Sequence, residues 1–404
     1  MSVDALFAPR QDEGQPCAPS MSEKSPKAAE LFLSFLRLGS TAFGGPAMVA
    51  YIRELAIRRE WVSGEEFAEG VALCQSIPGA TAMQSAAFVG LRAAGVRGAI
   101  AAYAGFGLPA VILMIAVSAA YRQAVNLAPV QAAFQGFRVM IVALVANAAL
   151  GFARAHVRSL PDVIVALASA LALHAKMSPV ALIACAVLLE VALRRRPPST
   201  SPAEPLRTWP PGITRTVPGM LAAALVIFLL LLHFAPRLGA LAGVCMKVDV
   251  LAFGGGFASV PLMFREMVES RAWLDAKTFM DGIALGQVTP GPIVVTATFV
   301  GYQLAGLAGA LVATVAVFFP SFAIVIAAAP WFGRLRGRAW FGPALHGAML
   351  SFVGLLVFVT GRFGTAVVWS PASVALAVAA LVALRAKVDV LWVVLGSGAV
   401  GVLL

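Results

Sequence analysis

Two segments within long apolar runs each combine a Pro-Gly pair with neutral polar side chains. The residues concerned are Gln75, Pro78, Gly79 and Thr81 in the first segment, and Gln287, Thr289, Pro290 and Gly291 in the second. Proline removes a backbone donor and glycine frees the backbone to turn, so the pattern predicts two discontinuous helices. The second half of a broken helix begins with unpartnered N–H groups that favour an anion, and the amides and hydroxyls add hydrogen-bond partners without charge. A purely structural kink is the alternative.

A glycine-rich segment precedes each of these breaks. It reads FGGP at 43–46 and FGGG at 253–256. Glycine lets a ligand or another backbone approach closely, so these segments are predicted to contact the substrate, with close helix packing as the alternative. The predicted contacts are Gly44, Gly45, Gly254 and Gly255.

Two cations stand at matched positions within apolar segments. Arg37 and Lys247 each lie seven residues before the first glycine of the glycine-rich segment. A cation inside a membrane span is unfavourable unless it pairs or reaches the surface. We predict that both residues balance the charge of an anion. Snorkelling to the membrane surface is the alternative, and Asp249 is near enough in sequence to pair with Lys247.

An Arg-Glu pair follows each glycine-rich segment. The pairs are Arg53 with Glu54 and Arg265 with Glu266. One interpretation is a gate or entry site for the substrate, and the other is a solvated surface pair.

Glu190, His233 and His346 lie in or near apolar segments and are candidates for carrying a coupling proton. The four histidines and four cysteines are scattered, without the spacing of a metal site or a hydrolase motif. We therefore expect no enzyme, no catalytic residues, no metal site and no cofactor.

The composition places these residues in a lipid bilayer. Of 404 residues, 60% are hydrophobic and 12% are charged, and the mean hydropathy is +0.89. Soluble domains are about 25% charged. Apolar runs of about twenty residues predict an all-α polytopic transmembrane helical bundle. The net charge of +11 comes from short basic runs between apolar segments, so we expect no nucleic-acid binding.

We expect about 12–13 spans. The candidates are 31–52, 71–91, 98–120, 138–155, 160–176, 178–193, 218–236, 239–260, 280–303, 305–330, 342–361, 366–385 and 387–404. Either glycine-rich span, 31–52 or 239–260, could re-enter rather than cross. The expected domains are a disordered cytoplasmic tail at 1–30, membrane repeat 1 at 31–193, a basic cytoplasmic linker at 194–217, a connecting transmembrane helix at 218–236 and membrane repeat 2 at 237–404.

The placement of Lys and Arg favours a cytoplasmic N-terminus. If all thirteen candidates cross, the five arginines of the linker fall inside, as the positive-inside rule requires. The loop at 53–70 is an exception, because its three arginines then fall outside.

The two membrane halves are copies of one another. FAEGVALCQSIPG at 67–79 and FMDGIALGQVTPG at 279–291 share seven of thirteen residues, and further matches reach Pro109 and Pro320 at offsets of 210–212. Seven expected spans separate the starts of the copies, which is an odd number, so the copies are predicted to have inverted topology. Inverted repeats are typical of secondary transporters, with the substrate near the midplane between the repeats.

The duplicated motifs resemble the chromate ion transporter family in its long, two-domain form, over about residues 31–404. The matching residues are Ser40 to Pro46, Arg53, Glu54, Trp61 and Gln75 to Gly79, and in the second copy Phe253 to Gly256, Arg265, Glu266, Trp273 and Gln287 to Gly291. The resemblance implies an inner-membrane secondary transporter that exports chromate, gives chromate resistance and uses the proton-motive force. The first break reads Pro-Gly-Ala where the second reads Pro-Gly-Pro, so the two copies need not form equivalent sites.

Residues and resemblance together predict the export of chromate, a tetrahedral dianion, with one repeat rocking against the other. Sulfate has a similar size, shape and charge. An importer or exchanger of sulfate or another oxyanion, an anion channel, and a membrane sensor without flux are therefore alternatives. A homodimer is a further option.

Overall fold

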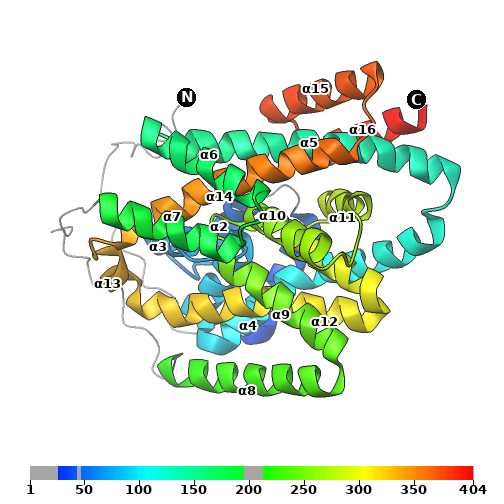
Figure 1. Ribbon diagram of the computed structural model, residues 1–404. Helices are drawn as coiled ribbons and strands as arrows, with labels where there is room; N and C mark the ends of the chain where they lie inside the picture. Colours follow the sequence, from blue (N-terminus) through cyan, green and yellow to red (C-terminus); the bar gives the residue numbers. More distant parts are fainter. Residues whose placement is uncertain (1–25, 43–46, 195–212, 404) are drawn as a thin grey trace, which may run out of the picture.

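The computed structural model describes residues 26–42, 47–194 and 213–403, and the regular elements among them are all helical (Figure 1). This confirms the predicted all-α membrane bundle. The first half comprises α1 (Ala28–Thr41), α2 (Ala47–Arg58), α3 (Gly64–Ser76), α4 (Thr81–Ala124), α5 (Ala128–His156), α6 (Leu160–His174) and α7 (Pro179–Leu193). Gly44, Gly45 and most of the predicted tail and linker lie outside the described residues.

The helix α8 (Ile213–Phe234) connects the halves. The second half comprises α9 (Pro236–Leu251), η2 (Gly256–Ala258), α10 (Ser259–Met263), η3 (Phe264–Ser270), α11 (Ala276–Val288), η4 (Ile293–Val295), α12 (Thr296–Ala328), η5 (Ala329–Trp331), α13 (Phe332–Arg336), α14 (Phe341–Ala366), α15 (Pro371–Arg385) and α16 (Val390–Leu403).

The helices of the first half pair as two hairpins, α1 with α2 and α3 with the first part of α4. Arg59, just after α2, forms an ion pair with Glu30 at the start of α1, at 3.6 Å. Arg92, late in the first part of α4, donates to Glu66 near the start of α3. The outer ends of two limbs can meet in this way only if the chain reverses at the break between them.

The second half repeats this arrangement. Lys247 on α9 donates to Glu266, beyond the glycine-rich break, at 2.6 Å. Gly282 of α11 packs against the ring of Phe299 of α12, across the Pro-Gly break. Each half therefore contributes two hairpin tips.

A further reversal lies inside each of the two longest helices. The residues that leave helical geometry are Ala94 and Gly95 in α4, and Ala305 and Gly306 in α12. Both glycines have positive φ, +64° and +58°, which glycine adopts without strain. The hydroxyls of Thr298 and Thr314 are 2.7 Å apart across the second turn. Sixteen residues of straight helix would separate them by about 24 Å.

These reversals change how the chain crosses a membrane. The predicted spans 31–52, 71–91, 239–260 and 280–303 are hairpin limbs rather than single crossings. Among the described residues, five helices are long and apolar enough to cross: Thr81–Ala124, Ala128–His156, Thr216–Phe234, Ile293–Arg336 and Phe341–Ala366. The helices α6, α7, α15 and α16 are apolar but shorter.

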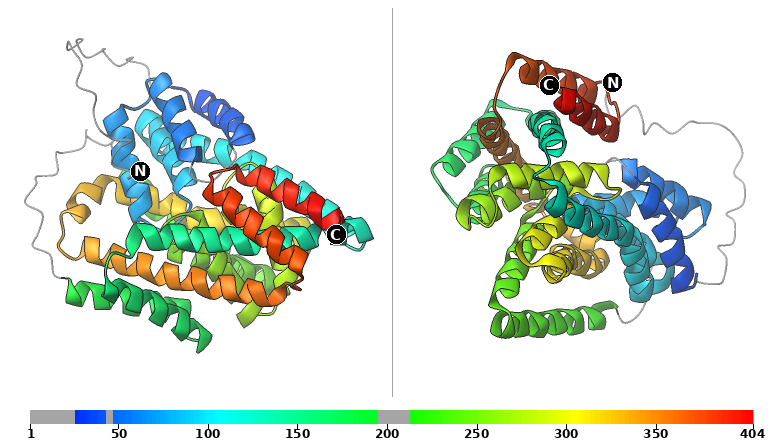
Figure 2. Two further views of the ribbon diagram at one scale, coloured as in Figure 1. Left: turned by 90° about the horizontal axis from the view of Figure 1, so that it is seen from above. Right: turned by 90° about the vertical axis from the view of Figure 1, so that its right-hand side faces the viewer.

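The two halves interlock through reciprocal contacts between matched helices. The long helix α5 packs against α15 and α16 of the second half, and α14 packs against α6 and α7 of the first (Figure 2). Added Cβ atoms would collide with the Ser397 carbonyl at Gly136 of α5, and with the Ala186 carbonyl at Gly347 of α14. The two contacts are related by a shift of 211 residues. Small residues permit this close packing, as is usual between membrane helices.

The equivalent helices α4 and α12 run antiparallel through the centre. Tyr103 donates to the Phe318 carbonyl at 2.7 Å, whereas Tyr121 near the end of α4 contacts Phe299, close to the turn that starts the second limb of α12. We call the end where α7 stops and α14 starts the linker end (left in Figure 1), and the end where α8 meets α9 the opposite end.

Candidate functional site

The tips of the hairpins meet between the two halves. The backbone N–H of Gly79 donates to the carbonyl of Ala252 at 2.9 Å, and the backbone N–H of Gly291 donates to the carbonyl of Ala42 at 3.2 Å. Gly79 matches Gly291, and Ala42 matches Ala252, in the internal repeat. Each Pro-Gly break is thus bonded to the edge of the glycine-rich break of the other half.

Only glycine fits the two Pro-Gly tips. Gly79 and Gly291 have φ values of +119° and +120°. A Cβ at Gly79 would collide with Ser321 of α12, and a Cβ at Gly291 with Ala110 of α4. Ala110 and Ser321 are themselves matched positions, so the tips of both halves are shaped alike.

The second glycine-rich tip lies beside the first Pro-Gly tip. Gly254 and Gly255 have φ values of +89° and +96°. The Thr81 hydroxyl lies 3.3 Å from the position of a Cβ added at Gly255, and Gly254 faces Phe152 and Met349. Thr81 and Gly255, from opposite halves, are therefore neighbours.

The helix starts at the tips lack the side-chain caps present at the outer ends. Ser63 caps α3 and Asp275 caps α11. Burial raises the pKa of Asp275, but hydrogen bonds from the first turn of α11 outweigh this effect and hold the pKa below its ordinary value. At the tips, Ala80, Gly255 and Pro292 provide no side-chain cap. The first N–H groups there have no partner within the helix and can bind an anion.

A cavity of about 440 Å³ lies at the linker end. Gln75 and Ser76 of α3 line it, opposite α14, which contributes Met349. Its cationic or titratable side chains are His156, Arg336 and His346. Basic groups in a cleft of this kind concentrate anions.

The matched place at the opposite end is closed. Arg138 of α5, which matches Met349, donates twice to Asp281 of α11, each time at 2.7 Å. The Tyr121 hydroxyl donates to the same carboxylate at 2.8 Å. Asp281 is fully buried. These bonds tie α11 to α5, whereas the cavity at the linker end separates α3 from α14.

The other residues of the Pro-Gly breaks are buried or half-buried, and one of them bonds within its own helix. The Thr289 hydroxyl is buried and donates to the Gly286 carbonyl at 3.1 Å. Gln287 is half-buried, and Pro78 and Pro290 are buried at their tips.

The two matched cations have different surroundings. Lys247 donates to Glu266 rather than to Asp249, which had been the alternative partner. Arg271 also pairs with Glu266. Arg37 is exposed. The hairpin explains this pairing, because the reversal places Glu266 beside Lys247.

In the second half, Arg265 and Glu266 bond to other residues rather than to each other. Arg265 pairs with Glu269 at 2.5 Å, and Glu269 also accepts from Arg362 at 2.8 Å. Arg53 and Glu54 are exposed.

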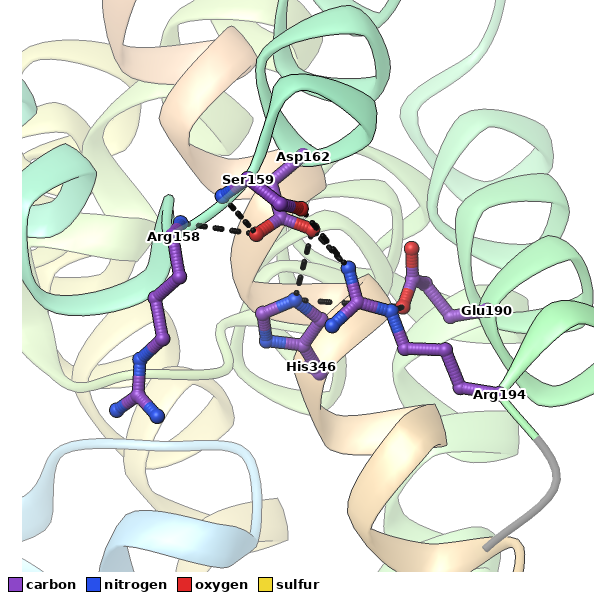
Figure 3. A network of polar contacts seen from close by, with 6 residues as sticks. All are labelled: Arg158, Ser159, Asp162, Glu190, Arg194 and His346. Carbon is purple, nitrogen blue, oxygen red and sulfur yellow. Dashed lines mark hydrogen bonds and ion pairs between the residues drawn. The ribbon is translucent and has the colours of Figure 1, made fainter.

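Asp162 and Glu190 are buried carboxylates at the linker end (Figure 3). Arg194 bonds to Asp162, and its Nε lies 2.8 Å from Glu190 Oε2. His346 Nε2 lies 3.3 Å from Asp162 Oδ1. The ligand atoms of Asp162, Glu190 and His346 lie within 4.8 Å of one another, close enough to share an ion, but the guanidinium of Arg194 already pairs with both carboxylates. The cluster joins α6 and α7 of the first half to α14 of the second.

Sequence reasoning did not identify Arg138, His156 or Arg336 as site residues. His156 and Arg336 stand at helix ends, where basic residues are ordinarily read as surface charges. The match of Asp281 with Glu69 was a usable signal, because an acidic residue recurs six residues before the glutamine of each break.

The fold defines a polytopic helical membrane protein built from two copies of a unit with paired hairpins. The chain belongs to the chromate transporter family. The family's model matches residues 29–191 and again residues 239–402.

Curated relatives cover most of the chain. A transporter of Methanocaldococcus jannaschii, described as uncharacterized, is 41% identical over 387 residues, which are 94% of this chain and 95% of the relative. A chromate transport protein of Cupriavidus metallidurans is 30% identical over 310 residues, 76% of this chain and 75% of the relative. A probable chromate transport protein of Synechococcus elongatus is 30% identical over 347 residues, 81% of this chain and 83% of the relative. No solved structure matches the chain.

Proposed function

We propose that this protein is a secondary active transporter that exports chromate across the bacterial inner membrane, confers chromate resistance and draws on the proton-motive force. The reciprocal bonds from Gly79 to Ala252 and from Gly291 to Ala42 carry the proposal. They bring the breaks of both repeats to one place at the repeat interface, where secondary transporters bind substrate. Membership of the chromate transporter family supports chromate as the substrate.

The proposed substrate site uses backbone donors and neutral side chains. Uncapped N–H groups at the tips would hold the dianion, and Thr81 beside Gly255 adds a hydroxyl. The proposed contacts are Gly44, Gly45, Gln75, Pro78, Gly79, Thr81, Gly254, Gly255, Gln287, Thr289, Pro290 and Gly291, with Arg37 and Lys247 for charge balance. Arg53, Glu54, Arg265 and Glu266 are the proposed entry residues. Arg336 would guide the anion into the cavity.

Alternating access follows from the difference between the two ends. The linker end has an open cavity between α3 and α14, whereas Arg138 and Asp281 close the matched place between α5 and α11. Exchanging these two arrangements would carry a bound anion from one side to the other. We propose that the two repeats rock against one another in this way.

We place the linker end in the cytoplasm. Because the breaks fold into hairpins, the arginines of the loop at 53–70 lie at the same end as α1's start, and Glu69 of α3 lies near Arg336. This arrangement removes the exception to the positive-inside rule. The tail at 1–30 and the linker at 194–217 would then be cytoplasmic. The helix α8 exposes apolar side chains, which lipid or a second copy in a homodimer would cover.

The test is chromate accumulation by inverted membrane vesicles that contain the protein. We expect accumulation in energised vesicles that collapses with an uncoupler, and competition by sulfate reports how well the site separates the two dianions. Chromate flux that is insensitive to the uncoupler would favour a channel. Accumulation of sulfate but not chromate would favour a transporter of another oxyanion, and no flux of either would contradict the proposal.

A further inference from the structure

Asp249 of α9 is a buried carboxyl group with an unused oxygen. The residue is 1% exposed, and its Oδ2 accepts a hydrogen bond from the Ser321 N–H at 2.6 Å. Its Oδ1 is buried without a hydrogen-bond partner. An ionised carboxylate in such a place is strongly unfavourable unless a cation or several donors accompany it.

A second unpartnered acceptor lies against the same serine. Gln84 of α4 donates from Nε2 to the Pro78 carbonyl at 2.6 Å and to the Ser321 carbonyl at 3.4 Å. Its Oε1 is buried without a partner. Both Asp249 and Gln84 thus offer an acceptor and lack a donor. One proton on Asp249 would turn an acceptor into a donor at this place.

The groups around Asp249 supply no neutralising cation within the described residues. The helix α12 carries no charged residue, and neither does α10. Tyr103 of α4 and Cys245 of α9 are the titratable neighbours, and the Tyr103 hydroxyl lies 3.1 Å from Ser321 Oγ. Two basic residues on the neighbouring helices do not pair with Asp249. His233 lies in the last turn of α8, and Lys247 is bonded to Glu266 at 2.6 Å.

This polar group exists in one half only and adjoins a hairpin tip. Asp249 matches Gly39, and Ser321 matches Ala110. Asp249 lies three residues before Ala252, whose carbonyl accepts from Gly79, and Ser321 is the residue that a Cβ at Gly79 would strike. We propose that Asp249 is the proton-binding site of the transporter and that its proton and the oxyanion are carried together. The inference rests on the proposed function.

Charge explains the coupling. A dianion at the tips repels an ionised Asp249, so protonation of the carboxylate favours anion binding, and anion binding equally favours protonation. The carboxylate takes one proton from water at the linker end and returns it to water at the opposite end. A dianion with one proton carries a single net negative charge. A membrane potential that is negative inside therefore drives the anion and its proton outward, whereas a pH gradient that is acidic outside opposes release of the proton. The electrical part of the proton-motive force is the driving part.

The test uses the full-length protein in liposomes loaded with chromate, with the membrane potential clamped by potassium and valinomycin and a pH dye outside. We expect protons to leave with chromate. Chromate itself takes up a proton near neutral pH, so Asp249→Asn supplies the comparison. This variant should lose the proton movement that wild type shows in excess of the protons that chromate itself binds. The chromate affinity of wild type should change with pH more steeply than that of the variant, by about tenfold per pH unit. Asp389→Asn, a change at an exposed helix start, should behave as wild type.

Several results would overturn the inference. They are protons moving against chromate, a flux that requires sodium, or an Asp249→Asn variant with the wild-type pH profile and proton movement. Retained chromate binding by Asp249→Asn shows that the variant is folded. If wild type moves no chromate at all, the proposed function fails first and the inference falls with it.

Discussion

The backbone N–H of Gly79 and the carbonyl of Ala252 are joined by a 2.9 Å hydrogen bond across the boundary between the two copies. Ala252 follows α9, so the bond satisfies an acceptor at the negative end of a helix. The second limbs begin at the same tips with uncapped, positive N-terminal ends. Each cross-copy bond uses one N–H donor and one carbonyl acceptor. The other N–H groups at the starts of the second limbs are the donors that suit an oxyanion.

Closure of the opposite end should depend on Arg138. The change Arg138→Met installs the residue found at the matched position 349, and it leaves Asp281 buried without its cation. Removing one partner of a buried pair costs about 3–5 kcal/mol, and parting α11 from α5 would relieve part of that cost by admitting water. We expect transport to fall and a cysteine at position 287 to react with an impermeant maleimide from the opposite end, in a background without native cysteines.

The control for this experiment is Arg122→Met. Arg122 lies near the end of α4, at the same end of the protein as Arg138, and its guanidinium lies 5.9 Å from the centre of the Tyr302 ring. This variant should label and transport as wild type. Equal labelling of position 287 in the wild type and in Arg138→Met would show that the ion pair does not close this end.

Arg336 should raise the local concentration of anions in the cavity. We expect Arg336→Gln to raise the KM for chromate about threefold to tenfold with little change in kcat, because the field of the cavity acts mainly on capture. Its rate should also depend less on ionic strength. Arg338→Gln is the matched control, since Arg338 is exposed and does not line this cavity. Equal KM values for the two variants would remove Arg336 from the entry path.

The stability of the linker end should depend on Arg194. Arg194→Ala would leave Asp162 and Glu190 buried without their cation, which costs about 3–5 kcal/mol. The expected result is a lower Tm in detergent. Adding Asp162→Asn and Glu190→Gln should restore much of the loss, because neutral side chains need no cation. A Tm unchanged by Arg194→Ala would show that the cluster contributes little.

The membrane class, the internal repeat and the breaks could be predicted from the sequence, because these depend on residue type and spacing alone. Glycine marked the three tips that the structure describes, and proline marked the two Pro-Gly tips among them. Hydropathy does not distinguish a helix that continues through a break from one that folds back. The limbs ending at Pro78 and Pro290 were therefore expected to cross, whereas they form hairpins.

The pairings of charged residues depended on that reversal. Lys247 has Asp249 as its near neighbour in sequence, but the hairpin places Glu266 opposite it. Arg138 and Asp281 are 143 residues apart and belong to different halves. Such contacts arise from the packing of one copy against the other, and one copy's sequence contains no sign of them.

The most direct test of the central claim is energised chromate accumulation by Gly79→Ala and Gly291→Ala in inverted vesicles, at matched protein abundance. Both glycines have φ near +120°, and an added Cβ would meet Ser321 or Ala110. We predict that both variants insert but do not accumulate chromate. Gly151→Ala, in a helix with nothing within 4 Å of the new Cβ, should accumulate it as wild type does. Wild-type accumulation by either tip variant would contradict a substrate site at the meeting hairpin tips.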